Sequence, residues 1–201
     1  MIQSGISGWT LGSYLEARFK IGHYNKGFIK LDNSIIDPQQ ASQRLDPHSE
    51  DLYKFQKDYF PKYIYGNKII HTYNNELVLA QAEHAWAFTS DVLTNGKYTI
   101  YYGNIAFSSK FHLYNAMGHE LIHIAHFERF GRLWKEKFSE YATNYWNYKI
   151  SSILGASEYA DAFLQEARSY YNFDPYSIWR IFKSDKVFKY MKYSDYGIPY
   201  N

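Results

Sequence analysis

Residues 118–126 read Gly-His-Glu-Leu-Ile-His-Ile-Ala-His, and this stretch decides how the rest of the chain is interpreted. His119 and His123 are four residues apart, so on a helix they lie one turn apart on the same face. Two imidazoles in that arrangement can bind one zinc ion, at roughly 2.0–2.1 Å each. Glu120 lies about 100° further round the helix, where it can accept a proton without being a ligand. The pattern H-E-x-x-H is therefore typical of a hydrolytic zinc site.

The flanking sequence predicts a buried helix over residues 110–129. Apolar side chains recur there at spacings of three and four and surround much of the circumference, which is typical of a central helix. Ser108 and Ser109 offer N-cap oxygens before it, and Gly131 is a suitable residue to end it. The motif is therefore expected on a helix in the middle of the molecule.

Two alternatives for the histidines remain open. His119 and His123 also fit core histidines hydrogen-bonded to other groups, although Glu120 would then be a poorly solvated carboxylate without a partner. His126 is a further candidate ligand, but on the helix it overlaps only partly with His123, which favours a surface or supporting role. The longer pattern that ends in a third histidine would need that residue at position 129, where the chain has Arg129.

A second helix, predicted over residues 133–154, offers the third protein ligand that a zinc ion with two histidines needs. Glu140 lies there among aromatic side chains, seventeen residues after His123. Gly131 permits a reversal of the chain, so that the two helices can lie antiparallel and bring Glu140 to the metal. Asn144, one turn after Glu140, is expected to hydrogen-bond the outer nitrogen of a ligand histidine and to fix its tautomer.

Together the two motifs resemble those of the gluzincin zinc metallopeptidases, over about residues 97–150. In that family a glutamate on the helix after H-E-x-x-H is the third ligand, which corresponds here to Glu140. The spacing from His123 is a few residues short, as in the minimal metallopeptidase domains at the C-termini of bacterial polymorphic toxins, and Asn144 replaces the usual aspartate. The resemblance implies a Zn²⁺ cofactor, a protein or peptide substrate, and a toxin or effector role with a cognate inhibitor or immunity protein as partner.

With zinc ligands His119, His123 and Glu140, the resemblance implies peptide hydrolysis with Glu120 as the catalytic general base. Two other functions remain open: a zinc-dependent amidase acting on cell-wall peptides, and a non-catalytic peptide-binding module with a degenerate metal site. An oxyanion donor besides the metal would also be needed. The sequence does not choose among the candidates Tyr141, Tyr145, Tyr170, Tyr171 and His112.

Length and composition narrow the function only slightly. The 201 residues fit a single domain, and a net charge of +2 is too near balance to indicate a nucleic-acid partner. The basic, aromatic stretch at 179–192 fits an amphipathic helix better than an RNA- or membrane-binding surface. Without cysteine, a metal must be held by histidine and carboxylate. No membrane span or signal peptide is visible. The sequence does not decide the localisation, and the bacterial cytoplasm and export as part of a larger effector both stay open.

The order of predicted elements indicates an α+β fold of the zincin type. Residues 1–62 are expected to be helical or irregular, 63–107 to form a small mixed or antiparallel sheet, and 108–201 to be helices that carry the metal motif. Beyond the two motif helices, the individual helices are expected at residues 11–19, 49–59, 157–171 and 175–191.

Two dipeptides in the sheet region predict β-hairpins. Asn95-Gly96 is the stronger signal, because both residues tolerate the positive φ angles of a type I′ turn. Gly66-Asn67, between apolar flanks over residues 63–73, is the second.

The two remaining segments of the sheet region differ in how clearly they can be assigned. Residues 76–88 fit either a strand or a helix. Residues 98–107 are expected to form the edge strand that pairs with substrate in gluzincin-like folds, with Gly103 allowing a close approach. A buried interior strand interrupted by a bulge is the alternative for this segment.

Overall fold

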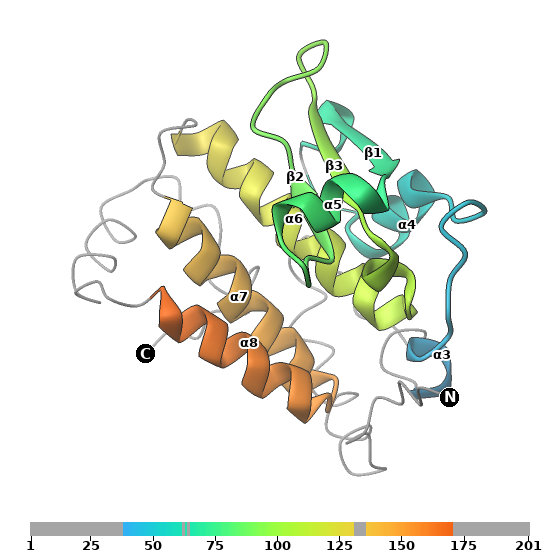
Figure 1. The fold of residues 1–201 in the computed structure, drawn as a ribbon, viewed down its shortest axis with the longest axis vertical. Helices are drawn as coiled ribbons and strands as arrows, with labels where there is room; N and C mark the ends of the chain where they lie inside the picture. Colours follow the sequence, from blue (N-terminus) through green and yellow to red (C-terminus); the bar gives the residue numbers. More distant parts are fainter. Residues whose placement is uncertain (1–37, 62, 64, 131–135, 171–201) are drawn as a thin grey trace.

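Helix α6 (Lys110–Phe130) carries the H-E-x-x-H motif and lies between a small sheet and a pair of helices (Figure 1). These elements are those of a computed structural model that describes residues 38–61, 63, 65–130 and 136–170. The sheet is on one side of α6, and α7 (Glu136–Ile153) and α8 (Ser157–Ser169) lie on the other. The described residues therefore form an α+β fold with a helix-rich second half, as predicted.

Helix α6 begins and packs as the sequence predicts. The Oγ atom of Ser109 accepts a hydrogen bond from the backbone N–H of His112 at 3.2 Å, which is the expected N-cap. The predicted end at Gly131 lies outside the described residues. Apolar side chains around the helix are fully buried, among them Phe111, Leu113, Met117, Leu121, Ile122 and Ile124. Because both layers cover α6, its polar motif residues are held inside the protein.

The sheet has three strands, β1 (Ile69–Tyr73), β2 (Ala87–Thr89) and β3 (Tyr98–Tyr102), in the order β1-β3-β2. β1 pairs with β3 in parallel and β2 pairs with β3 antiparallel, so the sheet is mixed. The prediction that residues 98–107 form an edge strand is wrong, because β1 pairs along the side of β3 that β2 leaves free. β3 is the central strand, and β1 and β2 are the two edge strands of this sheet. The segment after β3 is the 3-10 helix η2 (Asn104–Phe107).

One of the two predicted hairpins is confirmed. Asn95 and Gly96 have φ angles of 53° and 74°, and Thr94 and Lys97 exchange backbone hydrogen bonds of 2.8 and 3.0 Å across the turn. The hairpin around Gly66-Asn67 is wrong, since this segment is the 3-10 helix η1 (Gly66–Lys68). The strand that follows η1 pairs with β3, far along the chain, and a local turn signal cannot report such a partner.

Short helices precede and divide the strands. Asp51 caps α4 (Leu52–Tyr59) and Asn74 caps α5 (Asn75–Gln81), each by accepting a 3.0 Å hydrogen bond from a backbone N–H of the first turn. α4 confirms the helix predicted at 49–59. The ambiguous residues 76–88 contain most of α5 followed by β2, and the short α3 (Pro38–Ala41) precedes α4.

Two glycines are sites of close packing between elements. A Cβ atom on Gly103 would lie 2.9 Å from Cγ1 of Val78, so this glycine lets α5 approach the end of β3. A Cβ atom on Gly118 would lie 2.1 Å from the Trp146 ring. Gly118 directly precedes the first motif histidine, so the missing side chain allows α7 to lie close to α6 beside the motif.

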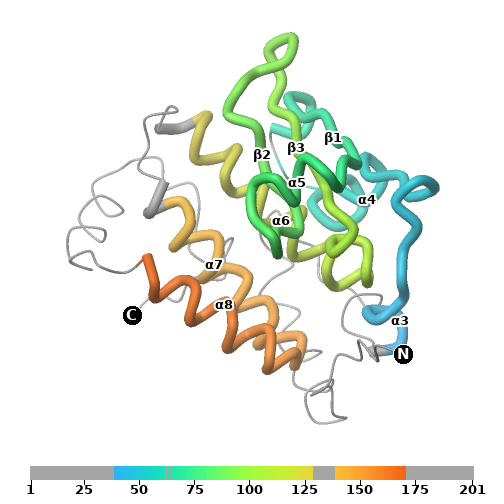
Figure 2. Tube along the Cα trace, viewed as in Figure 1, coloured from blue at the N-terminus to red at the C-terminus, as the bar shows by residue number. Residues whose placement is uncertain are grey.

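The helices α7 and α8 correspond to those predicted over 133–154 and 157–171. Gly155 between them has a φ of 74°, and the N–H of Ala156 donates to the carbonyl of Ser151 at 2.9 Å, which ends α7 in a Schellman motif. α8 then returns alongside α7 (Figure 2).

Two further predicted helices, at 11–19 and 175–191, lie outside the described residues. Among the helices that the structure describes, none combines the length and the apolar character needed to cross a membrane.

Candidate metal centre

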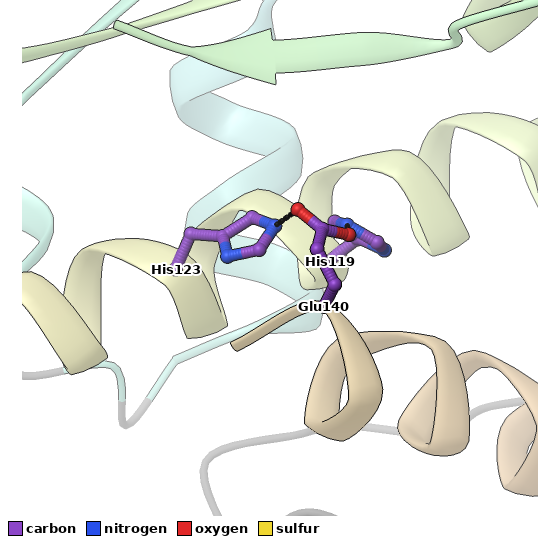
Figure 3. A group of neighbouring side chains, drawn as sticks. All are labelled: His119, His123 and Glu140. Atoms are coloured by element: carbon purple, nitrogen blue, oxygen red, sulfur yellow. Dashed lines mark ion pairs between the residues drawn. The ribbon is translucent and has the colours of Figure 1, made fainter. Parts of the chain in front are cut away.

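The three predicted ligand residues converge between α6 and α7 (Figure 3). Nε2 of His123 lies 3.2 Å from Oε1 of Glu140, and Nε2 of His119 lies 3.6 Å from Oε2 of the same carboxylate. Ligand atoms about 2.1 Å from one zinc ion in tetrahedral geometry would be about 3.4 Å apart. Two imidazole nitrogens and a carboxylate oxygen are donors that suit zinc, and one such atom from each of the three residues lies within 4.8 Å of the others.

The electrostatics of this group favour a cation. Burial lowers the pKa of His119, but the hydrogen bond that its ring donates to Glu140 and the negative charges of Glu140 and Glu120 outweigh burial and raise it to about 9. Burial raises the pKa of Glu140, but hydrogen bonds and charge from His119 and His123 outweigh it and hold that pKa well below its usual range. Two carboxylates thus lie beside the imidazoles in a largely buried pocket. A divalent cation bound to the neutral imidazoles would supply the positive charge that these carboxylates favour.

A chain of side-chain amides sets the tautomer of His119. Nδ2 of Asn115 donates to the carbonyl of Phe111 at 3.1 Å, so the Oδ1 atom of Asn115 is the end that accepts from Nδ2 of Asn147, at 3.0 Å. Oδ1 of Asn147 then faces Nδ1 of His119 at 2.8 Å and accepts its proton. Nε2 of His119 keeps its lone pair in the neutral ring, as a metal ligand requires.

A serine supports the second histidine. Oγ of Ser139 lies 2.6 Å from Nδ1 of His123 and 2.8 Å from Nδ1 of His126. A hydroxyl donates only one hydrogen bond, so Ser139 can accept from His123 and donate to His126. His126 is buried and is not part of the group whose ligand atoms converge. Its position fits the predicted supporting role.

The partner predicted for Asn144 is wrong. Its Nδ2 atom donates to the backbone carbonyl of Glu140 at 2.9 Å and lies 3.4 Å from Oε2 of that residue. Asn144 therefore steadies Glu140, while Asn147 and Ser139 contact the histidines. The reason is that α6 and α7 pack antiparallel. His123 therefore contacts Ser139 near the start of α7, whereas His119, one turn earlier on α6, contacts Asn147 further along α7.

Glu120 lies beside the group and is not part of it. Its side chain is buried, and Oε2 accepts a 2.7 Å hydrogen bond from the hydroxyl of Thr89 on β2. The proposed base is thus held against the edge strand. Sequence reasoning missed Thr89, Ser139 and Asn147. One signal for the last two is a polar stripe at intervals of four on an otherwise aromatic helix, formed by Ser139, Thr143 and Asn147.

The site opens into a groove of about 1260 Å³. Its walls come from strands β2 and β3, from the segment before β2, and from helices α5, α6, α7 and α8. Of the predicted oxyanion donors, Tyr170 lines the groove. His112 is buried against Trp86, and burial lowers its pKa to about 4. Tyr141 and Tyr145 are not among the lining residues and stack on each other, whereas Tyr171 lies outside the described residues.

Comparison with protein-family models, with curated proteins and with solved structures found no match for this chain. The chemistry of the site is therefore the basis on which a function is proposed.

Proposed function

We propose that this protein is a zinc-dependent metallopeptidase. The observation that carries the proposal is the convergence of His119, His123 and Glu140 from two helices, with Glu120 buried beside them. Two imidazoles and one carboxylate form a ligand set found in catalytic zinc sites, which leave one position for water or substrate. The shared groove gives a substrate access to all four residues.

Each residue has a distinct role in this proposal. His119, His123 and Glu140 would hold the ion, and zinc so bound lowers the pKa of a water ligand and polarises a carbonyl. Glu120 accepts the proton of the attacking water and returns it to the departing amine. The hydroxyl of Thr89 occupies one carboxylate oxygen of Glu120 and so fixes the direction of the other.

The edge strand supports a peptide as the substrate. β2 pairs with β3 on one side only, and its residues line the groove. An edge strand presents unpaired backbone N–H and C=O groups, to which an extended peptide can add as a further strand. Since Thr89 of β2 contacts Glu120, a peptide paired there would pass close to the general base.

A combined measurement of metal content and cleavage tests the proposal. The full chain, purified without chelator, should hold about one zinc per protein and cleave an unfolded model protein. Glu120→Gln should keep the zinc and lose about 10²- to 10⁴-fold in rate, because only the general base is removed. The matched control is Glu158→Gln, an exposed carboxylate on α8 that does not line the groove.

Three results would contradict the proposal. A protein without stoichiometric metal would favour the non-catalytic peptide-binding module. Retained turnover by Glu120→Gln would remove this residue from the mechanism. Cleavage of peptidoglycan fragments in preference to unfolded protein would favour a cell-wall amidase.

A toxin or effector role, with an immunity protein as inhibitor, would be supported by peptidase activity that a co-purifying protein suppresses.

A further inference from the structure

The groove beside the metal group differs in charge from the chain as a whole. The chain has 22 Lys and Arg residues and a net charge of +2. No Lys or Arg is found among the described residues that line the groove, whereas five acids are: Glu83, Asp91, Glu120, Glu140 and Glu166. A divalent ion at the site would balance Glu120 and Glu140. The remaining three acids would leave the groove negative.

Two of these acids are close in sequence to the two residues that form an aromatic corner of the groove. Trp86, directly before β2, packs edge-on against Phe163 of α8, with ring centroids 5.5 Å apart. Glu166 follows Phe163 by three residues on α8, so the two share one face of that helix. Glu83 precedes Trp86 by three residues, in a turn that lines the groove.

Among the described residues, no ion pair neutralises Glu83 or Glu166. Both side chains are exposed, and within the described part of the chain neither carboxylate forms an ion pair or a side-chain hydrogen bond. The corner therefore combines partly buried aromatic surface with two carboxylates that remain available to a ligand.

We propose that this corner, formed by Trp86, Phe163, Glu83 and Glu166, binds a lysine or arginine side chain of the substrate. The inference rests on the proposed peptidase function and adds a substrate class: extended peptides with basic residues. The aliphatic part of Lys or Arg packs against apolar surface while its charged end stays polar. The aromatic faces attract the cation, and the carboxylates pair with it. An acidic side chain at this corner would be repelled.

Peptide binding to the metal-loaded Glu120→Gln protein tests this assignment without turnover. The probes are three labelled peptides that are identical except that every second residue is Lys, Gln or Glu. At physiological ionic strength the Lys peptide should bind tightest and the Glu peptide weakest. Neutralising Glu83 and Glu166 together, as Glu83→Gln with Glu166→Gln, should weaken binding of the Lys peptide about two- to fivefold for each charge. Binding of the Gln peptide should not change.

The matched control removes the same charge elsewhere. Glu158→Gln with Asp161→Asn neutralises two exposed acids on α8 that do not line the groove. This pair should change the affinity for the Lys peptide less than twofold. If both double variants weaken binding equally, only general electrostatics are at work and the assignment to the corner is overturned. Equal affinity of the parent for the Lys and Gln peptides would also overturn it.

Cleavage of the same three peptides by the unmodified protein separates this inference from the proposed function. Cleavage without a preference for Lys would overturn the basic subsite and leave the peptidase proposal intact. Lys-selective binding that depends on Glu83 and Glu166, without any cleavage, would support the subsite and overturn the peptidase proposal.

Discussion

Two polar groups of the protein contain histidines whose pKa values are shifted in opposite directions. Between α6 and α7, His119 lies against two carboxylates, and its pKa is raised to about 9 despite burial. Beside the sheet, His71 donates from one ring nitrogen to Oε1 of Gln56 at 2.6 Å, and its other ring nitrogen lies 2.9 Å from the Tyr102 hydroxyl. Burial lowers the pKa of His71 to about 4.

The comparison shows that the neighbours of a buried imidazole decide what it can do. Gln56 and Tyr102 satisfy both nitrogens of a neutral ring, so His71 has no lone pair left for a metal and does not need positive charge nearby. Around His119 the amide of Asn147 uses only one nitrogen, and Glu140 makes positive charge favourable at the other. The first group is a structural part of the core, and the second is a group of side chains that could hold a cation.

The largest effect that separates the two groups is expected from Glu140→Gln. This change keeps the size of the side chain but removes its charge from the group of ligands. We expect the zinc dissociation constant to rise roughly 10²- to 10³-fold, because each protein ligand contributes a large share of the total binding free energy. Titration against a chromophoric chelator measures it. Unchanged affinity would place the third ligand elsewhere.

A pH titration of stability should distinguish the His71 group. Above about pH 6.5 both folded and unfolded chains carry neutral His71. Between pH 6.5 and about 4 the unfolded chain binds a proton that the folded protein does not. The free energy of unfolding therefore decreases as the pH is lowered through this range. The contribution of this residue is at most about 3 kcal/mol.

The measurement for His71 compares the metal-free protein with His71→Gln by denaturant unfolding across this range. The variant should lose part of the pH dependence whatever its absolute stability. His112, whose pKa burial also lowers to about 4, should keep its own contribution in both proteins. Parallel pH profiles for the two proteins would contradict the assignment.

Packing beside the metal group is tested by Gly118→Ala. The added Cβ would lie 2.1 Å from the Trp146 ring, so α6 and α7 must shift apart. We expect a loss of about 2 kcal/mol in stability, together with weaker zinc binding. Gly96→Ala is the control: its φ of 74° strains an alanine, but nothing lies within 4 Å of the new atom. The control should lower stability without weakening zinc binding.

The smallest effect is expected from the amide that orients His119. Asn147→Ala removes the Oδ1 atom that lies 2.8 Å from Nδ1 of His119. This change should weaken zinc binding about tenfold, the lower end of the roughly 10- to 100-fold effect typical of groups that orient a ligand histidine. Asn144→Ala, one turn away on the same helix, should weaken it less, since Asn144 donates mainly to the backbone carbonyl of Glu140. The reverse order, measured by the same chelator titration, would favour the partner for Asn144 that the sequence alone suggests.

Local patterns predicted the elements well where the chain interacts with itself over one or two turns. The buried helix α6, the helix at 49–59 and the Asn95-Gly96 turn are confirmed, because capping, apolar spacing and positive φ are properties of neighbouring residues. The hairpin at Gly66-Asn67 and the edge position of residues 98–107 are wrong for one shared reason. Strand β1 pairs with β3, 29 positions along the chain, and no local signal reports that partner.

By itself, the sequence determined which residues could ligate a metal and that two helices would carry them, since donor types and helical spacing are written in the chain. Tertiary structure alone decided which groups support those residues. Asn147, Ser139 and Thr89 reach the site because α7 packs antiparallel to α6 and because β2 forms the sheet edge. Such contacts depend on the relative placement of whole elements, which is set by the packing of the core and is not a property of any short segment.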